Sequence, residues 1–197
     1  MIKLFNKWDT AGASVEDSGL RGYINTTPYL VPRSCGKNAS NRFWKSKYNA
    51  VERLANKLMN PGHKGKKHKL SSGHCCGGWA RAYKTVERAF MIVEHKLKKN
   101  PFEVFVKALE NSAPREEVTS IEYGGARYPQ AVDCSPQRRV DIALRMMTQG
   151  AFAKTFHNKL KIEECLAEEL IKAYNFDNGS SAIAKKLELE RQADASR

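Results

Sequence analysis

The 197-residue sequence has no long apolar run. No stretch approaches the ~18 consecutive apolar residues that a membrane-spanning helix requires. The first nine residues, Met1 to Asp9, have no apolar core of the kind found in a secretory signal. Acidic residues at Asp9, Glu16 and Asp17 also argue against an organelle transit peptide. We therefore expect a soluble, cytoplasmic protein that does not enter a membrane.

Cysteine is scarce and is not arranged for disulfides or metal. The count of five is odd, and no pair has the C-x-x-C spacing, so we expect reduced thiols. Residues whose side chains can bind a metal ion are concentrated in one stretch: His63, His68, His74, Cys75 and Cys76. Adjacent cysteines fit poorly into one tetrahedral site, and no second ligand pair follows downstream. We favour loop residues over a zinc site, and expect no metal.

Catalytic motifs are also missing. Neither G-x-G-x-x-G nor G-x-x-x-x-G-K-[ST] is present, and no nucleophile has a base at a recognisable spacing. The pairs Glu163-Glu164 and Glu168-Glu169 are adjacent residues on one expected helix, so they point about 100° apart and do not face one another. We interpret these pairs as a solvated helix face. The sequence predicts neither an enzyme nor a bound cofactor.

Positive charge, in contrast, is abundant and concentrated. Between Arg33 and Asn100 the chain has 17 Lys and Arg residues and three acidic ones, while its overall net charge is +13. One third of the chain thus carries the whole excess, which favours a polyanionic partner. A solvated basic surface is the plainer alternative. A membrane surface would require a basic helix with a free apolar face, and the apolar stripes here are typical of core packing.

The apolar periodicity predicts a mainly α protein. Residues spaced at i, i+3, i+4 and i+7 indicate amphipathic helices, and Asn-Pro and Ser-Pro pairs mark two of their starts. The expected helices cover Asn49 to Asn60, Trp79 to Leu97, Pro101 to just before Pro114, a segment opening at Pro136, Lys161 to Tyr174, and a segment after Ser181. We also expect the Ser135 hydroxyl to accept a backbone hydrogen bond as the N-cap of the fourth.

Two regions depart from helical periodicity. Around residues 117–133, two glycines between β-forming residues predict a β-hairpin. Residues 1–40 are rich in turn formers and are expected to be an irregular N-terminal arm, with Tyr29-Leu30-Val31 as a possible short strand. The predicted architecture is a bundle of about six helices over residues 41–197, with one extended hairpin and this arm.

Basic residues alternate with aromatic ones in two places. One is Arg42-Phe43-Trp44-Lys45, followed by Tyr48, and the other is Tyr123 with Arg127 and Tyr128 at the hairpin. Aromatic and Arg planes stack on unpaired bases, while Lys and Arg bind phosphates. Phe43 and Trp44 fit a core position as well as a contact. The hairpin has little core of its own, so its tip is the better candidate for an interaction arm.

Several longer strings are distinctive: Val51 to Met59, Asn111 to Thr119, Tyr123 to Gly125, Ala131 to Asp141, Ile162 to Ile171 and Ser196-Arg197. Together they resemble one known family, the universal small-subunit ribosomal protein number seven, whose eukaryotic member is traditionally counted as number five. The resemblance spans Ile2 to Arg197 in order, and the N-terminal Lys3 to Trp8 is similar to the archaeal and eukaryotic branch. The segment from Leu70 to Trp79 departs from the family's pattern and looks like an insertion.

The resemblance implies a helical bundle with a long β-hairpin in the head of the small ribosomal subunit. It implies direct binding to the 3′ major domain of the small-subunit rRNA, nucleation of head assembly, and neighbouring head proteins as partners. The hairpin residues Tyr123, Gly124, Gly125, Arg127 and Tyr128 would lie near the exit-site tRNA and the mRNA. The residues expected to contact rRNA are Arg42, Lys45, Arg53, Lys57, Lys64, Lys66, Lys67, Lys69, Arg115, Arg138, Arg139 and Arg145.

A free-standing basic RNA- or DNA-binding regulator is the alternative to a ribosomal protein. Such a regulator would use a recognition helix with a predictable half-site, and the sequence shows none. We also expect Arg138 and Arg139 to affect RNA affinity while having little effect on folding.

Overall fold

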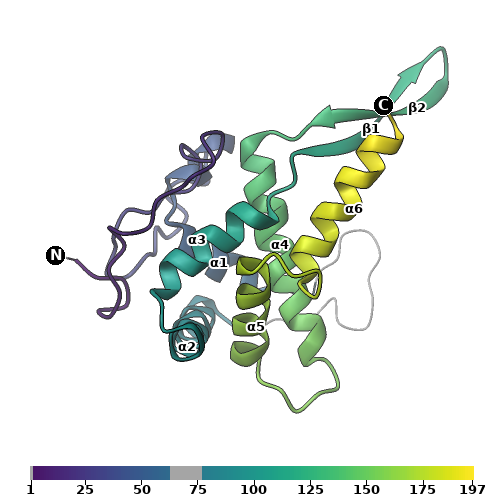
Figure 1. Ribbon diagram of the computed structural model, residues 1–197. Helices are drawn as coiled ribbons and strands as arrows, with labels where there is room; N and C mark the ends of the chain where they lie inside the picture. The colour runs from purple at the N-terminus through teal and green to yellow at the C-terminus, as the bar shows by residue number, and fades with distance from the viewer. Residues whose placement is uncertain (1, 63–76) are drawn as a thin grey trace.

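A computed structural model describes residues 2–62 and 77–197 of the chain. Within these residues the elements are six α-helices, one 3-10 helix and one antiparallel strand pair (Figure 1), which confirms the expected mainly α class. In chain order they are η1 (Arg42–Lys47), α1 (Ala50–Leu58), α2 (Trp79–Leu97), α3 (Pro101–Ser112), β1 (Glu116–Tyr123), β2 (Ala126–Asp133), α4 (Pro136–Thr155), α5 (Ile162–Tyr174) and α6 (Ser181–Ala195).

Helix α5 is at the centre of the bundle, where it packs against α2, α3 and α4. Its inward stripe, including Cys165, Leu166 and Leu170, is fully buried, as the periodicity predicts. Helix α1 lies against α2 and α4, and α6 lies against α4 and the hairpin. Burying each Leu side chain stabilises the fold by roughly 1.5–3 kcal/mol. None of the helices within the described residues is long and apolar enough to cross a membrane.

Side chains cap three of the helices. Asn49 accepts a hydrogen bond from the backbone N–H of Val51, and Asn100 accepts one from Phe102. Ser180 does the same for the first turn of α6. The expected cap from Ser135 is wrong, because its side chain makes no capping hydrogen bond. The proline after it is not the cause, because Asn100 caps α3 although Pro101 follows it; Ser135 is exposed to solvent.

The N-terminal segment has no long regular element, yet it completes the core. Phe5 stacks on Tyr83 of α2 with ring centroids 4.4 Å apart, and Trp8 meets Phe90 edge-on at 5.8 Å. The indole N–H of Trp8 also donates to Glu94 across 3.0 Å. This segment therefore contributes aromatic surface to α2 in the same hydrophobic cluster as the helices.

The possible strand at Tyr29-Leu30-Val31 is wrong. Leu30 and Val31 form a bend, no strand of the described residues pairs with the segment, and the three residues are 44–55% exposed. Pro28 and Pro32 flank the segment, and neither has a backbone N–H to offer a neighbouring strand. A run of three β-forming residues therefore does not form a strand unless a second strand pairs with it.

The β-hairpin projects beyond the bundle, and the end of α6 lies beside its base (Figure 1). The strands pair from Glu116↔Asp133 to Tyr123↔Ala126, leaving a two-residue turn at Gly124 and Gly125. Both glycines have positive φ, at +59° and +82°, a conformation that glycine adopts without steric cost. The expected hairpin is confirmed.

Candidate nucleic-acid interface

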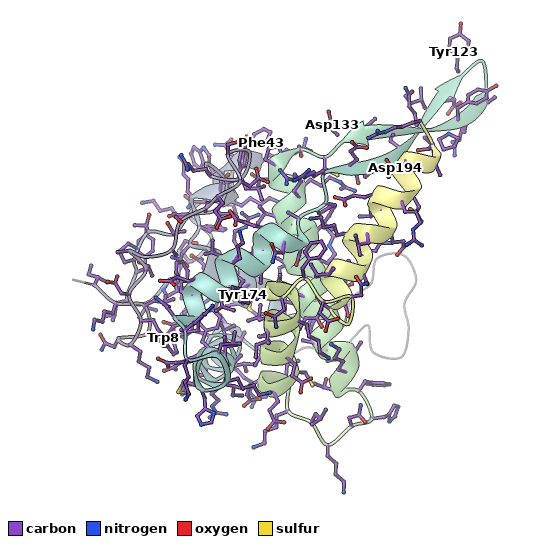
Figure 2. The ribbon with its side chains drawn as sticks, in the orientation of Figure 1. Trp8, Phe43, Tyr123, Asp133, Tyr174 and Asp194 are labelled. Atoms are coloured by element: carbon purple, nitrogen blue, oxygen red, sulfur yellow. The ribbon has the colours of Figure 1, made fainter. Side chains whose placement is uncertain are left out.

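The short helix η1 is fixed onto the start of α4 by side-chain amide contacts. The Gln137 side-chain amide donates to the Arg42 carbonyl at 3.2 Å, and the Ser46 hydroxyl donates to the Gln137 amide oxygen at 3.1 Å. Phe43 and Trp44 are thereby held outward, 61% and 38% exposed. Phe43 lies at the edge of the molecule in Figure 2. The sequence allowed either a core position or a contact position for these two rings, and the structure places both at the surface.

Three of the predicted RNA-contacting cations converge on one carboxylate, Asp141 of α4, and a fourth lies beside them. Lys45 of η1 reaches one oxygen at 2.6 Å, and Arg53 of α1 reaches the other at 3.1 Å. Lys57 of α1 is close enough to interact electrostatically with this carboxylate, and Arg145 of α4 is close enough to interact with Lys57. Residues far apart in the chain thus form one strongly positive cluster around a single negative charge.

The charges in this cluster shift one another's pKa. Burial disfavours ionised Asp141, but hydrogen bonds and charges from Lys45 and Arg53 outweigh it and lower the Asp141 pKa below its ordinary 3.8. Burial lowers the pKa of Lys57; the Asp141 carboxylate opposes that shift, while the neighbouring cations reinforce it. The site therefore holds more positive charge than its own carboxylate neutralises. An external anion would relieve this imbalance.

We define the basic face as the exposed or half-exposed cations of this region, Arg42, Lys45, Lys47, Lys57 and Arg145. Two of them lie over the aromatic rings beside them. The Lys47 ammonium is 4.5 Å from the Trp44 ring centre, and the Arg42 guanidinium is 5.9 Å from that of Phe43. Phosphate-binding cations interleaved with exposed rings are the combination that single-stranded nucleic acid recognition uses.

Arg53 is buried, unlike the cations of the basic face. Its side chain is only 5% exposed, and it also donates to the Tyr23 carbonyl at 3.0 Å. Burial lowers its pKa, although the Asp141 charge opposes that shift. Arg53 therefore orients Asp141 and ties the N-terminal segment to α1. We leave it out of the basic face.

The other predicted arginines surround the hairpin base, away from that face. Arg139 is half-buried and donates to Asp17 at 2.7 Å and to the Pro114 carbonyl at 3.0 Å. Arg138 pairs with Glu117 of β1 through two nitrogens. Arg115 is exposed, and its backbone N–H donates to Glu190 of α6. The structure gives Arg138 and Arg139 intramolecular roles in holding the hairpin base and the N-terminal segment.

The far end of the hairpin presents a second aromatic surface. Cross-strand pairing of Ile121 with Tyr128 and of Tyr123 with Ala126 places these four side chains on one face. Tyr123 is 82% exposed, Tyr128 58% and Ile121 43%. In Figure 2, Tyr123 is at the outermost end of the hairpin. Arg127 pairs loosely with Glu122 at 3.5 Å on the opposite face.

Several predicted residues lie outside the described residues. They are the basic-loop lysines Lys64, Lys66, Lys67 and Lys69 and the histidine and cysteine set His63, His68, His74, Cys75 and Cys76. In residues 2–62 and 77–197, no three or more metal-ligating side chains are placed to hold one ion. Of the cysteines in those ranges, Cys35, Cys134 and Cys165 are free thiols.

The expectation of a solvated face is wrong for Glu169. Its side chain is fully buried, and it accepts hydrogen bonds from Lys154 of α4, the Ser180 hydroxyl and the Ala182 N–H at 2.7–3.2 Å. It therefore joins α4 and α5 to the first turn of α6. The signal was present in the sequence, since Glu169 follows Cys165 by four residues and Leu166 by three, which places it on the buried stripe.

Comparison with known proteins gives one consistent result. Residues 20–197 match the family described as ribosomal protein S7p/S5e. A protein of Nanoarchaeum equitans named small ribosomal subunit protein uS7 is 55% identical over 196 residues, covering 100% of this chain and 99% of the relative. A uS7 protein of Methanococcus maripaludis is 46% identical over 198 residues, with the same coverage. One from Methanothermobacter thermautotrophicus is 46% identical over 194 residues, covering 98% of each chain.

Proposed function

Because this chain belongs to the ribosomal protein S7p/S5e family, we propose that its basic face binds the rRNA of the small ribosomal subunit directly. The chain is a small-subunit ribosomal protein, which makes rRNA its natural polyanionic partner. The observation that carries the proposal is the convergence of Lys45 and Lys57 on Asp141, with Arg145 close to Lys57, beside the exposed rings of η1. The proposed role is structural and requires no catalysis.

The finer parts of the proposal follow the family. We propose that the protein binds the 3′ major domain of the rRNA, nucleates assembly of the subunit head beside neighbouring head proteins, and works in ribosomes of the cytoplasm. We also propose that the hairpin surface of Tyr123, Gly124, Gly125, Arg127 and Tyr128 lies near the exit-site tRNA and the mRNA. The exposure of this tip supports a contact beyond the protein's own core.

The salt dependence of binding tests the basic face. Replacing Arg42, Lys47 and Arg145 together by Ala should flatten the plot of log affinity against log salt concentration for small-subunit rRNA. Each lost phosphate contact should reduce the slope by about 0.7–0.9. The matched control removes three exposed cations elsewhere, Lys96, Lys159 and Arg191. An equal change in both triple variants would mean that binding depends on total charge and not on this face.

The basic loop permits an independent version of the same test. Replacing Lys64, Lys66, Lys67 and Lys69 by Ala should lower the slope by the same increment for each phosphate contact. An unchanged slope would remove these lysines from the binding surface and leave the proposed face intact.

Sedimentation separates this function from that of a free-standing regulator. The protein should co-migrate with small subunits through a moderate-salt wash of a cell lysate. A predominantly free pool, with subunits lacking the protein, would favour the regulator.

A further inference from the structure

A cavity of about 330 Å³ lies between the N-terminal segment and the junction of η1 with α1. The residues that line it and matter for its chemistry are Tyr29, Arg33, Lys37, Lys47, Tyr48 and Glu52. Lys47 is also part of the basic face, so the cavity is continuous with that surface. Three cations and two tyrosine rings surround one carboxylate, and the cavity therefore favours an anionic, planar ligand.

The carboxylate of Glu52 is a built feature of this cavity. The residue is 5% exposed, and one of its oxygens accepts both the N–H and the hydroxyl of Ser34, at 2.8 and 2.6 Å. These two bonds fill that oxygen's lone pairs and fix the orientation of the group. The other oxygen, Oε2, accepts no hydrogen bond from the described residues. This second oxygen is not one of the buried polar atoms that lack a partner, so it is available to a ligand that enters the cavity.

We propose that this cavity receives an unpaired guanine base of the rRNA, an inference that rests on the proposed function. The free Glu52 oxygen has two lone pairs and would accept two adjacent donors. On the Watson–Crick edge, guanine alone presents adjacent N–H donors, N1–H and N2–H. Adenine and cytosine place an acceptor beside their amino group, and uracil places carbonyls on both sides of its N3–H. The carboxylate would repel those acceptors.

The remaining side chains of the cavity fit the rest of a nucleotide. Tyr29 is 44% exposed, and Tyr48 is half-exposed, so both offer ring surface to a base, the common mode of single-strand recognition. Lys37 and Lys47 are exposed cations at the same opening and would bind the flanking phosphates. The basic face would then hold the backbone of the same strand, while the cavity selects one of its bases.

Glu52→Gln separates this inference from plain electrostatics. The substitution removes a negative charge, so on charge alone the variant should bind rRNA as tightly as the wild type or more tightly. Recognition of guanine predicts the opposite, because the amide has one donor facing the base where two acceptor lone pairs are needed. The affinity of the cavity for that base should fall roughly five- to a hundred-fold. The matched control is Glu188→Gln, which makes the same charge change at an exposed site on α6.

Kethoxal probing of rRNA bound to the full-length protein reads the outcome directly, because this reagent attacks N1 and N2 of unpaired guanine. With wild-type protein and with Glu188→Gln, one guanine should be protected, and with Glu52→Gln it should become reactive again. Tyr29→Ala, at an exposed position that does not support the core, should weaken the same protection by a comparable factor. If circular dichroism shows that Glu52→Gln does not fold, Tyr29→Ala provides the test in its place.

Three outcomes would overturn the inference. The first is rRNA binding with no guanine whose protection depends on Glu52 or Tyr29. The second is a dependent protection that falls on adenine, cytosine or uracil when base-selective reagents are used. The third is Glu52-dependent binding of another small-subunit protein in place of a base. If the wild-type protein bound no rRNA at all, the proposed function would fall together with this site.

Discussion

The basic face and the hairpin both present cations beside aromatic rings, but the fold supports them differently. The basic face rests on α1 and α4, and its Lys45 shares Asp141 with the buried Arg53. The hairpin is held by its own strand pairing and by contacts at its base, and residues 119–130 are all exposed. Changes in the first region should therefore affect folding and binding together. Changes at the hairpin tip should affect binding alone.

The strongest test of this difference is Asp141→Ala. It leaves Arg53 buried without its carboxylate and brings Lys45, Lys57 and Arg145 together without a compensating charge. Removing one partner of a buried ion pair costs about 3–5 kcal/mol of unfolding free energy. Urea denaturation monitored by circular dichroism measures the loss. Glu188→Ala, which breaks an exposed pair with Lys185, should change stability by less than about 1 kcal/mol, and equal losses would refute the role of Asp141.

Acidification should weaken the bundle through the same carboxylate. The pKa values of Asp141 and Asp17 are lowered in the folded protein, so their stabilising contribution is present above the unfolded value of 3.8 and is lost as the pH falls through the lower folded values. Unfolding free energy measured near pH 7 and near pH 3 should show this decrease. The decrease should be smaller in Asp141→Asn than in the wild type, and an identical decrease would contradict the assignment.

Two serines that precede helices sharpen the comparison further. Ser180 is fully buried and bonds to Glu169 and to the first turn of α6, so Ser180→Ala should cost about 1–2 kcal/mol. Ser135 precedes α4 beside the hairpin and makes no cap bond, so Ser135→Ala should stay within about 0.5 kcal/mol. Thermal denaturation of the two variants provides the measurement. A cost at Ser135 equal to that at Ser180 would show that the Ser135 hydroxyl does cap α4.

The smallest effect on folding is expected from trimming the hairpin. Deleting Glu122 through Pro129 and closing the strands with a short turn removes exposed residues only, so stability should change by about 0.5 kcal/mol or less. Incorporation into reconstituted small subunits should also be retained. Exit-site tRNA release and reading-frame maintenance are the properties expected to change. Failure to incorporate would make the hairpin an rRNA anchor, while normal frame and tRNA release would remove its proposed role.

The fold was predictable where the information is local. The apolar spacing of Trp79 to Leu97 and the glycine pair at Gly124-Gly125 correctly predicted α2 and the hairpin. Each depends on neighbours within a few residues, which the sequence shows directly. Tyr29-Leu30-Val31 was misassigned because a strand also needs a partner, and local propensity cannot supply one.

The candidate site was only partly predictable, because its partners are distant in the chain. Arg53 and Asp141 are 88 positions apart, and Arg139 and Asp17 are 122 apart. The resemblance to the ribosomal family placed these arginines among the expected RNA-contacting cations, and nothing local in the sequence distinguishes a buried arginine from an exposed one. Only tertiary packing buries Arg53, gives Arg139 its intramolecular partners Asp17 and Pro114, and leaves Lys45, Lys57 and Arg145 exposed or half-exposed.

The aromatic anchor of the N-terminal segment has a consequence for how the chain folds as it is synthesised. Trp8 finds its hydrogen-bond partner Glu94 only after 86 further residues have been made, and Phe5 and Trp8 pack on rings of α2. Contacts this distant in sequence slow folding, and the apolar rings stay exposed in the meantime. The nascent chain should therefore be prone to aggregate until α2 has emerged, and chaperone demand should peak before that point.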